Sequence, residues 1–315
     1  MILYVLKRLL QSIVTILLVV TIVFLLLRLL PTDYYFTEDE LMKLTEEQKH
    51  DRLEAAGFLD PPLTQLGRFF KQLFTEFDLG TSRRIQANQP VVAVIGSKFG
   101  VSMRLGLISL GISLVIGVCF GVLQARYKDG IFDHTGTAYT VFVNAVPGLV
   151  TYSLVLAFGA RVLGLPSMYS MRKPELSAIL PIVCLSIGSI AGYMLWTRRY
   201  MVDELNKDYI RLAKLKGMST RSVMYRHVLK NAFVPLAQYL PYSILLTVGG
   251  SLLVERFFSV PGMGPLLTDS IARYDTTVVQ GVVMLYATLG ILFLGDVLMT
   301  LIDPRIHLGK KGGAR

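Results

Sequence analysis

The chain has 315 residues, of which 53% are hydrophobic and only 17% are charged. Soluble domains carry about 25% charged residues, so this composition excludes an ordinary soluble protein and indicates a membrane protein. The net charge of +10 does not call for nucleic acid, because the anionic headgroups of membrane lipid attract basic loops. We therefore expect membrane lipid as a partner and no nucleic acid.

Six stretches of the chain contain no charged residue and are 19 to 26 residues long. A helix rises about 1.5 Å per residue and the hydrocarbon core is about 30 Å thick, so about 20 residues suffice to cross it. The pattern predicts an all-α membrane protein with six transmembrane helices. The stretches are Leu9–Leu27, Leu105–Ala125, Thr135–Ala160, Leu176–Thr197, Asn231–Val254 and Thr276–Gly295.

Residues 1–30 are predicted to form a cytoplasmic N-terminus and the first transmembrane helix. A signal peptide is the alternative, since Lys7 and Arg8 precede the apolar run. The run is longer than the apolar core of a signal peptide, and Arg28–Pro31 lacks the small residues of a cleavage site. We expect the helix to be retained.

Residues 31–101 are predicted to form an extracytoplasmic helical subdomain between the first two transmembrane helices. Thr37–Glu40 and Thr45–Glu47 have the chemistry of helix starts. After Pro61–Pro62, apolar residues recur at helical spacing from Leu63 to Leu73, which predicts an amphipathic helix. Phe77–Ser82 reads as a turn.

Residues 102–304 are predicted to hold transmembrane helices 2–6, followed by a cytoplasmic tail at 305–315. Helix breakers lie inside two spans, at Pro147-Gly148 and Gly249-Gly250. The termini and even-numbered loops carry 17 basic residues, against 5 in the short odd-numbered loops. By the positive-inside rule both termini face the cytoplasm.

The cytoplasmic loop 198–232 carries nine Lys or Arg between Arg198 and Lys230, against three acidic residues. Asp203 and Glu204 predict a helix start and Gly217 a left-handed stop, and Ser219 is expected to cap a second helix to about Lys230. Five residues share one face of the first helix, on which Ala213 is expected to allow close approach of another backbone. They are Leu205, Tyr209, Leu212, Ala213 and Lys216. A basic surface helix pair lying on lipid is the alternative.

Catalytic and metal-binding patterns are not visible. The four histidines lie on separate loops without ligand spacing, and there is no phosphate-binding loop that could hold ATP. We therefore expect no enzyme activity, no cofactor and no metal in this chain. Asp296 directly follows the last uncharged stretch and lies inside the mostly apolar segment Val278–Ile302. A carboxylate paired near the cytoplasmic interface and a role in the translocation path are both open for it.

Six segments spread over nearly the whole chain share one pattern. They are Asp208–Gly217, Arg226–Pro235, Phe77–Ser82, Val254–Gly264, Gln280-Gly281 and Asp303–Ile306. Together they resemble one family, the permeases of binding-protein-dependent ABC importers, and within it the first permease subunit of dipeptide and oligopeptide importers. One departure concerns the cytoplasmic loop, where the broad family pattern begins Glu-Ala-Ala and this chain has no glutamate before Leu212-Ala213.

The resemblance implies a type I ABC importer permease fold in a bacterial or archaeal cytoplasmic membrane. It implies three kinds of partner: a second homologous permease subunit, two cytoplasmic ATPase subunits that bind ATP and Mg²⁺, and an extracytoplasmic solute-binding protein. The residues expected to couple this chain to the ATPases are Asp208, Tyr209, Arg211, Leu212, Ala213, Lys216, Gly217, Arg226 and His227.

A peptide translocated by alternating access is the expected cargo, with a nickel or metal chelate and glutathione as alternatives. An ion-coupled secondary transporter or channel and a membrane scaffold are further alternatives, although buried charges and internal repeats are not visible. The expected external gate loop comprises Phe258, Pro261, Gly262 and Gly264. The residues expected along the path are Asn144, Pro147, Tyr152, Tyr239, Tyr242 and Asp296.

Overall fold

The computed structural model describes residues 2–30, 32–248 and 251–294. Within these ranges the chain is helical, and its one extended pairing is an isolated bridge between Thr81 and Pro90. The described residues divide into two compact units: the segments up to Val101 and from Pro261 onward form one, and Ser102–Val260 form the other. Each unit is described by itself, and the predicted division at 30, 101 and 304 stays a prediction.

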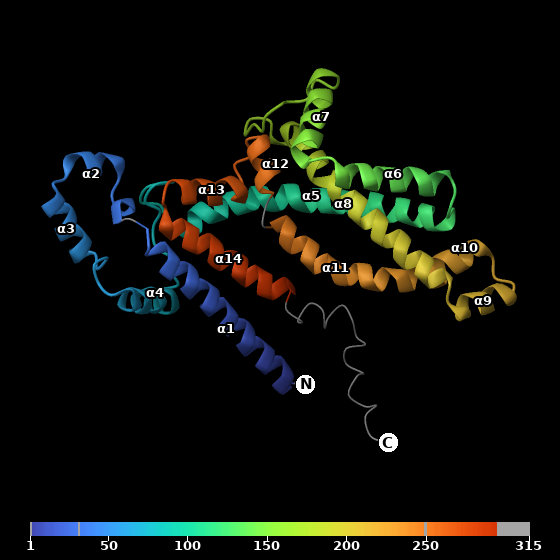
Figure 1. Cartoon of the computed structure of the whole chain (residues 1–315), viewed down its shortest axis with the longest axis horizontal. Coiled ribbons are helices and arrows are strands. Elements are labelled where there is room, and N and C mark those ends of the chain that lie inside the picture. The colour runs from blue at the N-terminus through green and yellow to red at the C-terminus, as the bar shows by residue number, and fades with distance from the viewer. Residues whose placement is uncertain (1, 31, 249–250, 295–315) are drawn as a thin grey trace. The chain divides into compact units, whose positions relative to one another are not determined.

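In the first unit, α1 and α14 lie side by side, α4 packs against α1, and α13 packs against α14 (Figure 1). The start of α5 contributes Val91, Val94 and Ile95 to a buried cluster with residues of α13 and α14. The elements are α1 (Ile2–Leu27), η1 (Thr32–Tyr35), α2 (Glu38–Lys43), α3 (Glu46–Ala55), α4 (Pro62–Glu76), the start of α5 (Val91–Arg126), α13 (Met263–Ala272) and α14 (Thr276–Leu294).

The helical signals of residues 31–101 are confirmed. The hydroxyls of Thr37 and Thr45 each accept a backbone hydrogen bond, and the side chains of Glu40 and Gln48 close both capping boxes. The amphipathic helix is α4, in which Leu73 is buried. The predicted apolar face of this helix, from Leu63 to Leu73, is only partly buried, because Leu63 is exposed.

In the second unit, α6 and α11 both pack against α8, and α7 also contacts it. The remaining course of α5 runs along α8, and glycines allow close approach: a Cβ added at Gly121 would lie 2.6 Å from Cβ of Thr197. The elements are the rest of α5, α6 (Ile131–Ala145), α7 (Gly148–Arg161), α8 (Pro174–Leu205), α9 (Asp208–Leu215), α10 (Thr220–Val223), a π-helix η2 (Met224–Leu229), α11 (Lys230–Val248) and α12 (Leu252–Phe257).

Four helices among the described residues are long and apolar enough to cross a membrane, and a bent pair raises the number to at most five. The apolar part of α14, Thr276–Gly290, is shorter than a span, and the residues after 294 are outside the described ranges. Gly249-Gly250 also lies outside them. The exact number of six transmembrane helices therefore stays a prediction, while an all-α protein with several apolar helices is confirmed.

The predicted break at Pro147-Gly148 divides one apolar stretch into α6 and α7, which meet at an angle of 111°. Proline disfavours the helical conformation for the residue before it, and Val146 accordingly adopts an extended conformation with ψ 128°. This stretch is a broken span or a re-entrant pair of helices.

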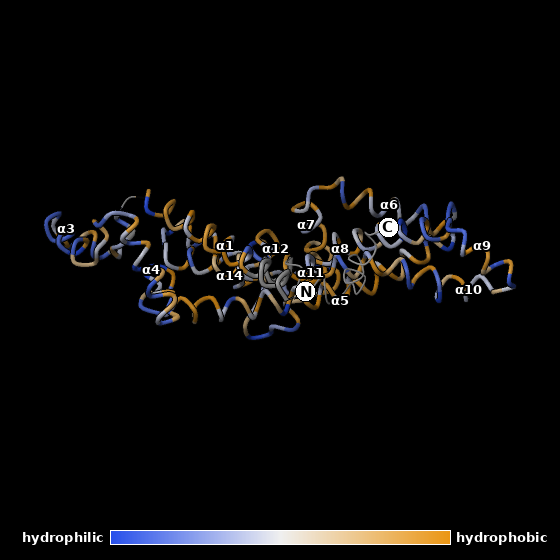
Figure 2. Tube along the Cα trace, turned by 90° about the horizontal axis from the view of Figure 1, so that it is seen from below, coloured by the Kyte–Doolittle hydropathy of each residue, from blue (hydrophilic) through white to orange (hydrophobic). Residues whose placement is uncertain are grey.

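Hydrophobic residues follow the long helices, whereas hydrophilic residues gather around α3 and around α9 and α10 (Figure 2). Many large apolar side chains on the long helices are exposed in the isolated chain, among them Val115 on α5 and Val141 on α6. Contiguous apolar helix surfaces are typical of segments that face lipid or a partner helix.

Candidate functional site

The loop between α8 and α11 contains the short helix α9, which begins at Asp208 and ends before Gly217. Gly217 has a φ of +80°, as predicted for a left-handed stop. The predicted start of this helix was wrong: Asp203, Glu204 and Leu205 form the last turn of α8, and Lys207 is the N-cap of α9. The C-cap of α8 is Asn206, where the helix ends.

One face of α9 is buried within this chain. Ile210 is 0% and Ala213 is 8% exposed, in a cluster with Val122 and Ala125 of α5 and Met201 of α8. The small Ala213 side chain allows α9 to pack closely on α5 and α8 of its own unit. A contact of this residue with a partner subunit stays a prediction.

The opposite face of α9 is apolar and exposed. Leu212 is 57% and Leu215 is 83% exposed. Arg211, exposed like these leucines, forms a 3.5 Å ion pair with Asp208 one turn earlier, and Lys216 at the C-cap is exposed as well. Exposed leucines surrounded by charges are typical of a protein interface.

Polar contacts fasten the first turn of α9 to its neighbours. The Tyr209 hydroxyl donates to the carboxylate of Glu204, at the end of α8. Asn231 Nδ2, at the start of α11, donates to Tyr209 Oη at 2.7 Å and to Glu204 Oε1 at 3.2 Å. Burial, together with the hydrogen bond to Glu204, raises the pKa of Tyr209, so the phenol stays protonated and remains a donor.

The helix after Gly217 is longer than predicted. Ser219 caps α10 through the N–H of Ser222 at 3.3 Å, as expected. The helix does not end near Lys230, because the backbone stays helical through the π-helix η2 into α11. Arg226, exposed, and His227, half-buried, lie on η2. A π-helical segment inside a longer helix is frequent at functional positions.

A cavity of about 480 Å³ lies within the second unit, between α5, α8 and α11. At its middle the Tyr193 hydroxyl donates to Ser243 Oγ at 2.7 Å, and the ring of Tyr239 meets that of Tyr193 edge-on. Toward one end, the Ser102 hydroxyl donates to Glu255 Oε1 at 2.7 Å. At the other end Trp196 and Tyr200 are stacked. The cavity therefore offers aromatic faces, hydroxyls and one carboxylate.

Of the residues predicted along the path, Tyr239 lines this cavity. The tilted ring of Tyr242 contacts that of Tyr239, with ring centroids 5.2 Å apart. Asn144 lines a separate hollow of about 590 Å³ between α6 and α8. Pro147 precedes α7, and Tyr152 on α7 contacts Phe257. Asp296 lies outside the described residues. The structure thus brings only Tyr239 and Tyr242 together.

The predicted gate loop is divided between the two units. Phe258 in the second unit is fully buried, and its carbonyl accepts the N–H of Tyr169 at 2.8 Å. Pro261, Gly262 and Gly264 belong to the first unit, where Gly262 is the N-cap of α13. A gating role of these residues stays a prediction.

Two of the recognised motifs have structural roles in the first unit. Ser82 ends the predicted turn after α4, and its hydroxyl donates to the buried carboxylate of Asp275 at 2.7 Å. Gly281 allows the start of α5 to approach α14, since a Cβ there would lie 2.5 Å from Cγ1 of Val91. The closing motif Asp303–Ile306 lies outside the described residues.

Sequence reasoning missed three features. Tyr193, Trp196 and Tyr200 share one face of α8 at helical spacing, which was a usable signal for the cavity wall. Asp133 and Arg198 each lie next to an uncharged run, and they form an ion pair in which Asp133 is buried and Arg198 partly buried. Asp275 directly precedes the last uncharged run and gave no signal of its partners.

Potential metal ligands gather at one place in the part of the chain that the structure describes. His50, Asp51 and Glu54 lie together on α3, and all three are exposed. Exposed carboxylates commonly lie together without a metal, and nothing else at this position indicates an ion. The expectation of no cofactor or metal stays a prediction.

This chain is similar to a known protein family, to named relatives and to a solved structure. The sequence pattern of the family described as "Binding-protein-dependent transport system inner membrane component" matches residues 117–308, more than half of the chain. The chain belongs to this family. It is therefore a multi-pass membrane permease component of an ABC transport system, and it has the type I ABC importer permease fold.

Two dipeptide permeases match this permease over almost its full length, and an oligopeptide permease matches two thirds of it. The dipeptide transport system permease protein DppB of Bacillus subtilis (strain 168) is 32% identical over 98% of this chain and 99% of its own. DppB of Lactococcus lactis subsp. cremoris (strain MG1363) is 31% identical over 98% of this chain. The oligopeptide permease AmiC of Streptococcus pneumoniae serotype 4 is 36% identical over 66% of this chain and 42% of its own.

A chain of the inward-facing MetNI methionine ABC transporter is similar in fold to this permease. The similarity has a TM-score of 0.55 with 16% identity and covers 67% of this permease and 97% of that chain. At this identity the likeness concerns the fold alone.

Proposed function

We propose that this chain is a pore-forming subunit of an ATP-driven importer of di- or oligopeptides. The observation that carries the proposal is the 32% identity to a dipeptide permease over 98% of this chain. The cavity of about 480 Å³ supports it, because hydroxyls and aromatic faces suit a peptide backbone and its side chains.

The chain works with a second homologous permease, two cytoplasmic ATPase subunits that bind ATP and Mg²⁺, and an extracytoplasmic solute-binding protein. Both termini face the cytoplasm of a bacterial or archaeal cell, which places α9 on the ATPase side. The exposed leucines Leu212 and Leu215 provide the apolar part of that interface, and Arg211 and Lys216 its charged rim. Because this chain lacks the glutamate that the broad family pattern has before Leu212-Ala213, these four side chains make the contact with the ATPase subunit.

Alternating access follows from how α9 is attached. Ile210 and Ala213 are packed against the ends of α5 and α8, so α9 moves together with those helix ends. Closure of the ATPase dimer shifts α9, and the helices around the cavity change their packing between two discrete arrangements. Residues 31–101 and the loop 258–264 cover the external side and meet the binding protein.

The test is reconstitution of the chain with its partner subunits and binding protein in liposomes. We expect uptake of a labelled dipeptide that requires both ATP and the binding protein. Glutathione and a nickel chelate are supplied as competing solutes, and uptake of either in place of the peptide overturns the peptide assignment. Uptake driven by an ion gradient without ATP overturns the importer assignment.

A further inference from the structure

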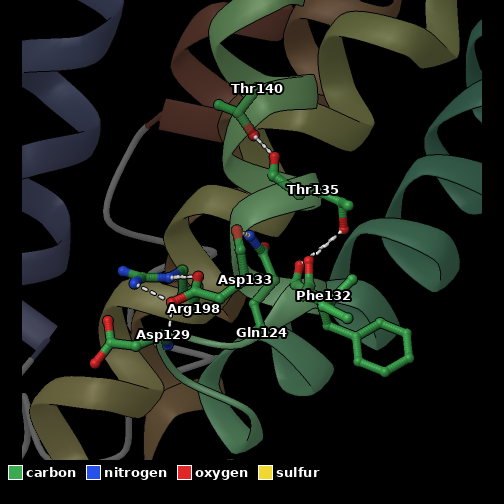
Figure 3. Close-up of polar contacts among 9 residues, drawn as sticks. Gln124, Asp129, Phe132, Asp133, Thr135, Thr140 and Arg198 are labelled. Atoms are coloured by element: carbon green, nitrogen blue, oxygen red, sulfur yellow. Dashed lines mark hydrogen bonds and ion pairs between the residues drawn. The ribbon is translucent and has the colours of Figure 1, made fainter.

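An ion pair between a buried aspartate and a partly buried arginine joins α6 to α8, close to the point where α8 leads into α9. Asp133, in the first turn of α6, is 3% exposed. The Arg198 guanidinium binds both oxygens of its carboxylate, with the NH2 group 2.7 Å from Oδ2 (Figure 3). Two parallel bonds from arginine to a carboxylate fix both distance and orientation.

The same aspartate organises the connection between α5 and α6. The backbone N–H of Asp129 donates to Asp133 Oδ2 at 3.0 Å, and Gln124 Nε2 of α5 donates to the Asp133 carbonyl at 3.2 Å. Figure 3 shows Asp129 and Gln124 beside the carboxylate and carbonyl they contact. The ends of α5, α6 and α8 are thus joined through one residue.

Close packing makes this junction rigid. A Cβ added at Gly136 of α6 would lie 2.4 Å from Nε2 of Gln124, and one at Gly121 would meet Thr197. The Cβ at Gly121 would also lie 2.8 Å from the carbonyl oxygen of Met194, so the backbones of α5 and α8 are close and have little room to slide, whereas Gly136 leaves space for the Gln124 side chain. The junction is also adjacent to α9, because Val122, Ala125 and Met201, which pack against α9, flank Gln124 and Arg198 in the sequence.

We propose that the Asp133–Arg198 pair is a positioning element that transmits the movement of α9 from α8 into the α5–α6 hairpin. Without the pair, α8 follows α9 while α6 does not. ATP hydrolysis then continues but moves less substrate. The pair touches no substrate, and its role is to keep three helix ends moving as one body.

The chain contains a matched control. Arg104 and Glu175 form an ion pair that joins α5 to the opposite end of α8, and their side chains are 55% and 78% exposed. This pair is also an arginine bound to a carboxylate and also holds α8 to a neighbouring helix, but it is far along α8 from α9. Exposed pairs of this kind contribute little to stability.

The test measures dipeptide imported per ATP hydrolysed by the complete transporter in liposomes. We expect Arg198→Lys, which keeps the charge but loses the paired bonds, and Asp133→Asn to lower this ratio about tenfold. The exchange variant Asp133→Arg with Arg198→Asp is expected to restore part of it. Arg104→Gln with Glu175→Gln is expected to leave the ratio within about twofold of wild type.

The outcome separates a positioning role from a structural one. If the Asp133→Asn chain does not assemble with its partner subunits, the import-to-ATP ratio of the charge-conserving Arg198→Lys variant tests the proposal instead. An assembled Arg198→Lys transporter with a wild-type import-to-ATP ratio overturns the proposal, even if less complex is formed. The inference rests on the proposed function, and the two can fail separately. A wild-type transporter that imports no peptide overturns the proposed function. Variants of an importing transporter with an unchanged import-to-ATP ratio overturn only the role of the pair.

Discussion

Each compact unit buries one aspartate almost completely, and the two carboxylates are stabilised in different ways. Asp133 in the second unit binds the guanidinium of Arg198, which comes from another helix. Asp275 in the first unit is held by donors without charge: three successive backbone N–H groups, starting at that of Arg83, and the hydroxyls of Ser82 and Thr277.

The difference shows what each carboxylate can do. A buried charge must be compensated, either by an opposite charge or by aligned dipoles. The donors of Asp275 belong to the loop 82–85 and to its own turn, so this site fastens a loop in place. The partner of Asp133 belongs to α8, so that site can transmit a displacement between helices.

The largest effect is expected from Asp275→Ala. Removal of the carboxylate leaves several buried donors without an acceptor, and we expect a loss of about 4 kcal/mol in the free energy of unfolding. Denaturant unfolding of the purified chain in detergent measures it. Asp275→Asn keeps one acceptor oxygen and is expected to lose less unfolding free energy. A loss below about 1 kcal/mol for Asp275→Ala would show instead that the loop rearranges and that its donors bind water.

A smaller loss, about 3 kcal/mol, is expected from Asp133→Ala, because it leaves the Arg198 guanidinium partly buried without its counter-charge. Glu175→Ala, which breaks the exposed pair with Arg104, is expected to leave stability nearly unchanged, because solvent screens this pair. The same unfolding experiment applies. Equal losses in the two variants would contradict the distinction between a buried and an exposed pair.

The helices, the capping boxes at Thr37 and Thr45, the stop at Gly217 and the break at Pro147 could all be predicted, since each depends on local sequence. The contacts of Asp133 and Asp275 could not, since their partners lie 65 and about 190 residues away. Sequence patterns give no information on which distant donor meets a carboxylate.

The α9 segment illustrates a second limit. Helical spacing predicted that Tyr209, Leu212 and Ala213 share one face, but the structure divides this face. Ala213 is buried in the cluster with Val122 and Met201, whereas Leu212 is exposed. The spacing could not tell which of these side chains this chain covers itself. The predicted start at Asp203 failed because an acidic pair that suits a helix N-terminus is placed here at the end of α8, where Glu204 accepts hydrogen bonds from α9 and α11.

The stability of the first unit is expected to depend on pH in the acid range. Burial alone raises the pKa of Asp275, but hydrogen bonds from Ser82, Ile85, Arg84 and Thr277 outweigh it and hold the pKa below its ordinary value. A carboxyl with a lowered folded-state pKa stabilises the fold fully above its unfolded pKa of about 4, and this contribution is lost as pH falls through the folded value. Unfolding measured between neutral pH and pH 2 is therefore expected to show an acid-side loss that is smaller in Asp275→Asn. An identical pH profile in that variant would exclude Asp275 as the titrating group.

The smallest effect concerns the end of α9, on the side of the molecule where the Asp133 junction lies. Nothing lies within 4 Å of a Cβ added at Gly217, so Gly217→Ala tests only its φ of +80°, a conformation that costs an L-residue about 1 kcal/mol. Gly111→Ala is the control, because it also meets nothing within 4 Å but lies inside α5 with an ordinary helical φ, where alanine is expected to stabilise slightly. Opposite signs in the unfolding free energies are expected, together with faster hydrogen exchange in α9 of Gly217→Ala alone. If both variants stabilise the chain, the left-handed stop at Gly217 does not hold α9 against α5 and α8. The coupling of α9 to the Asp133 junction would then depend on Ile210, Ala213 and the contacts of Tyr209.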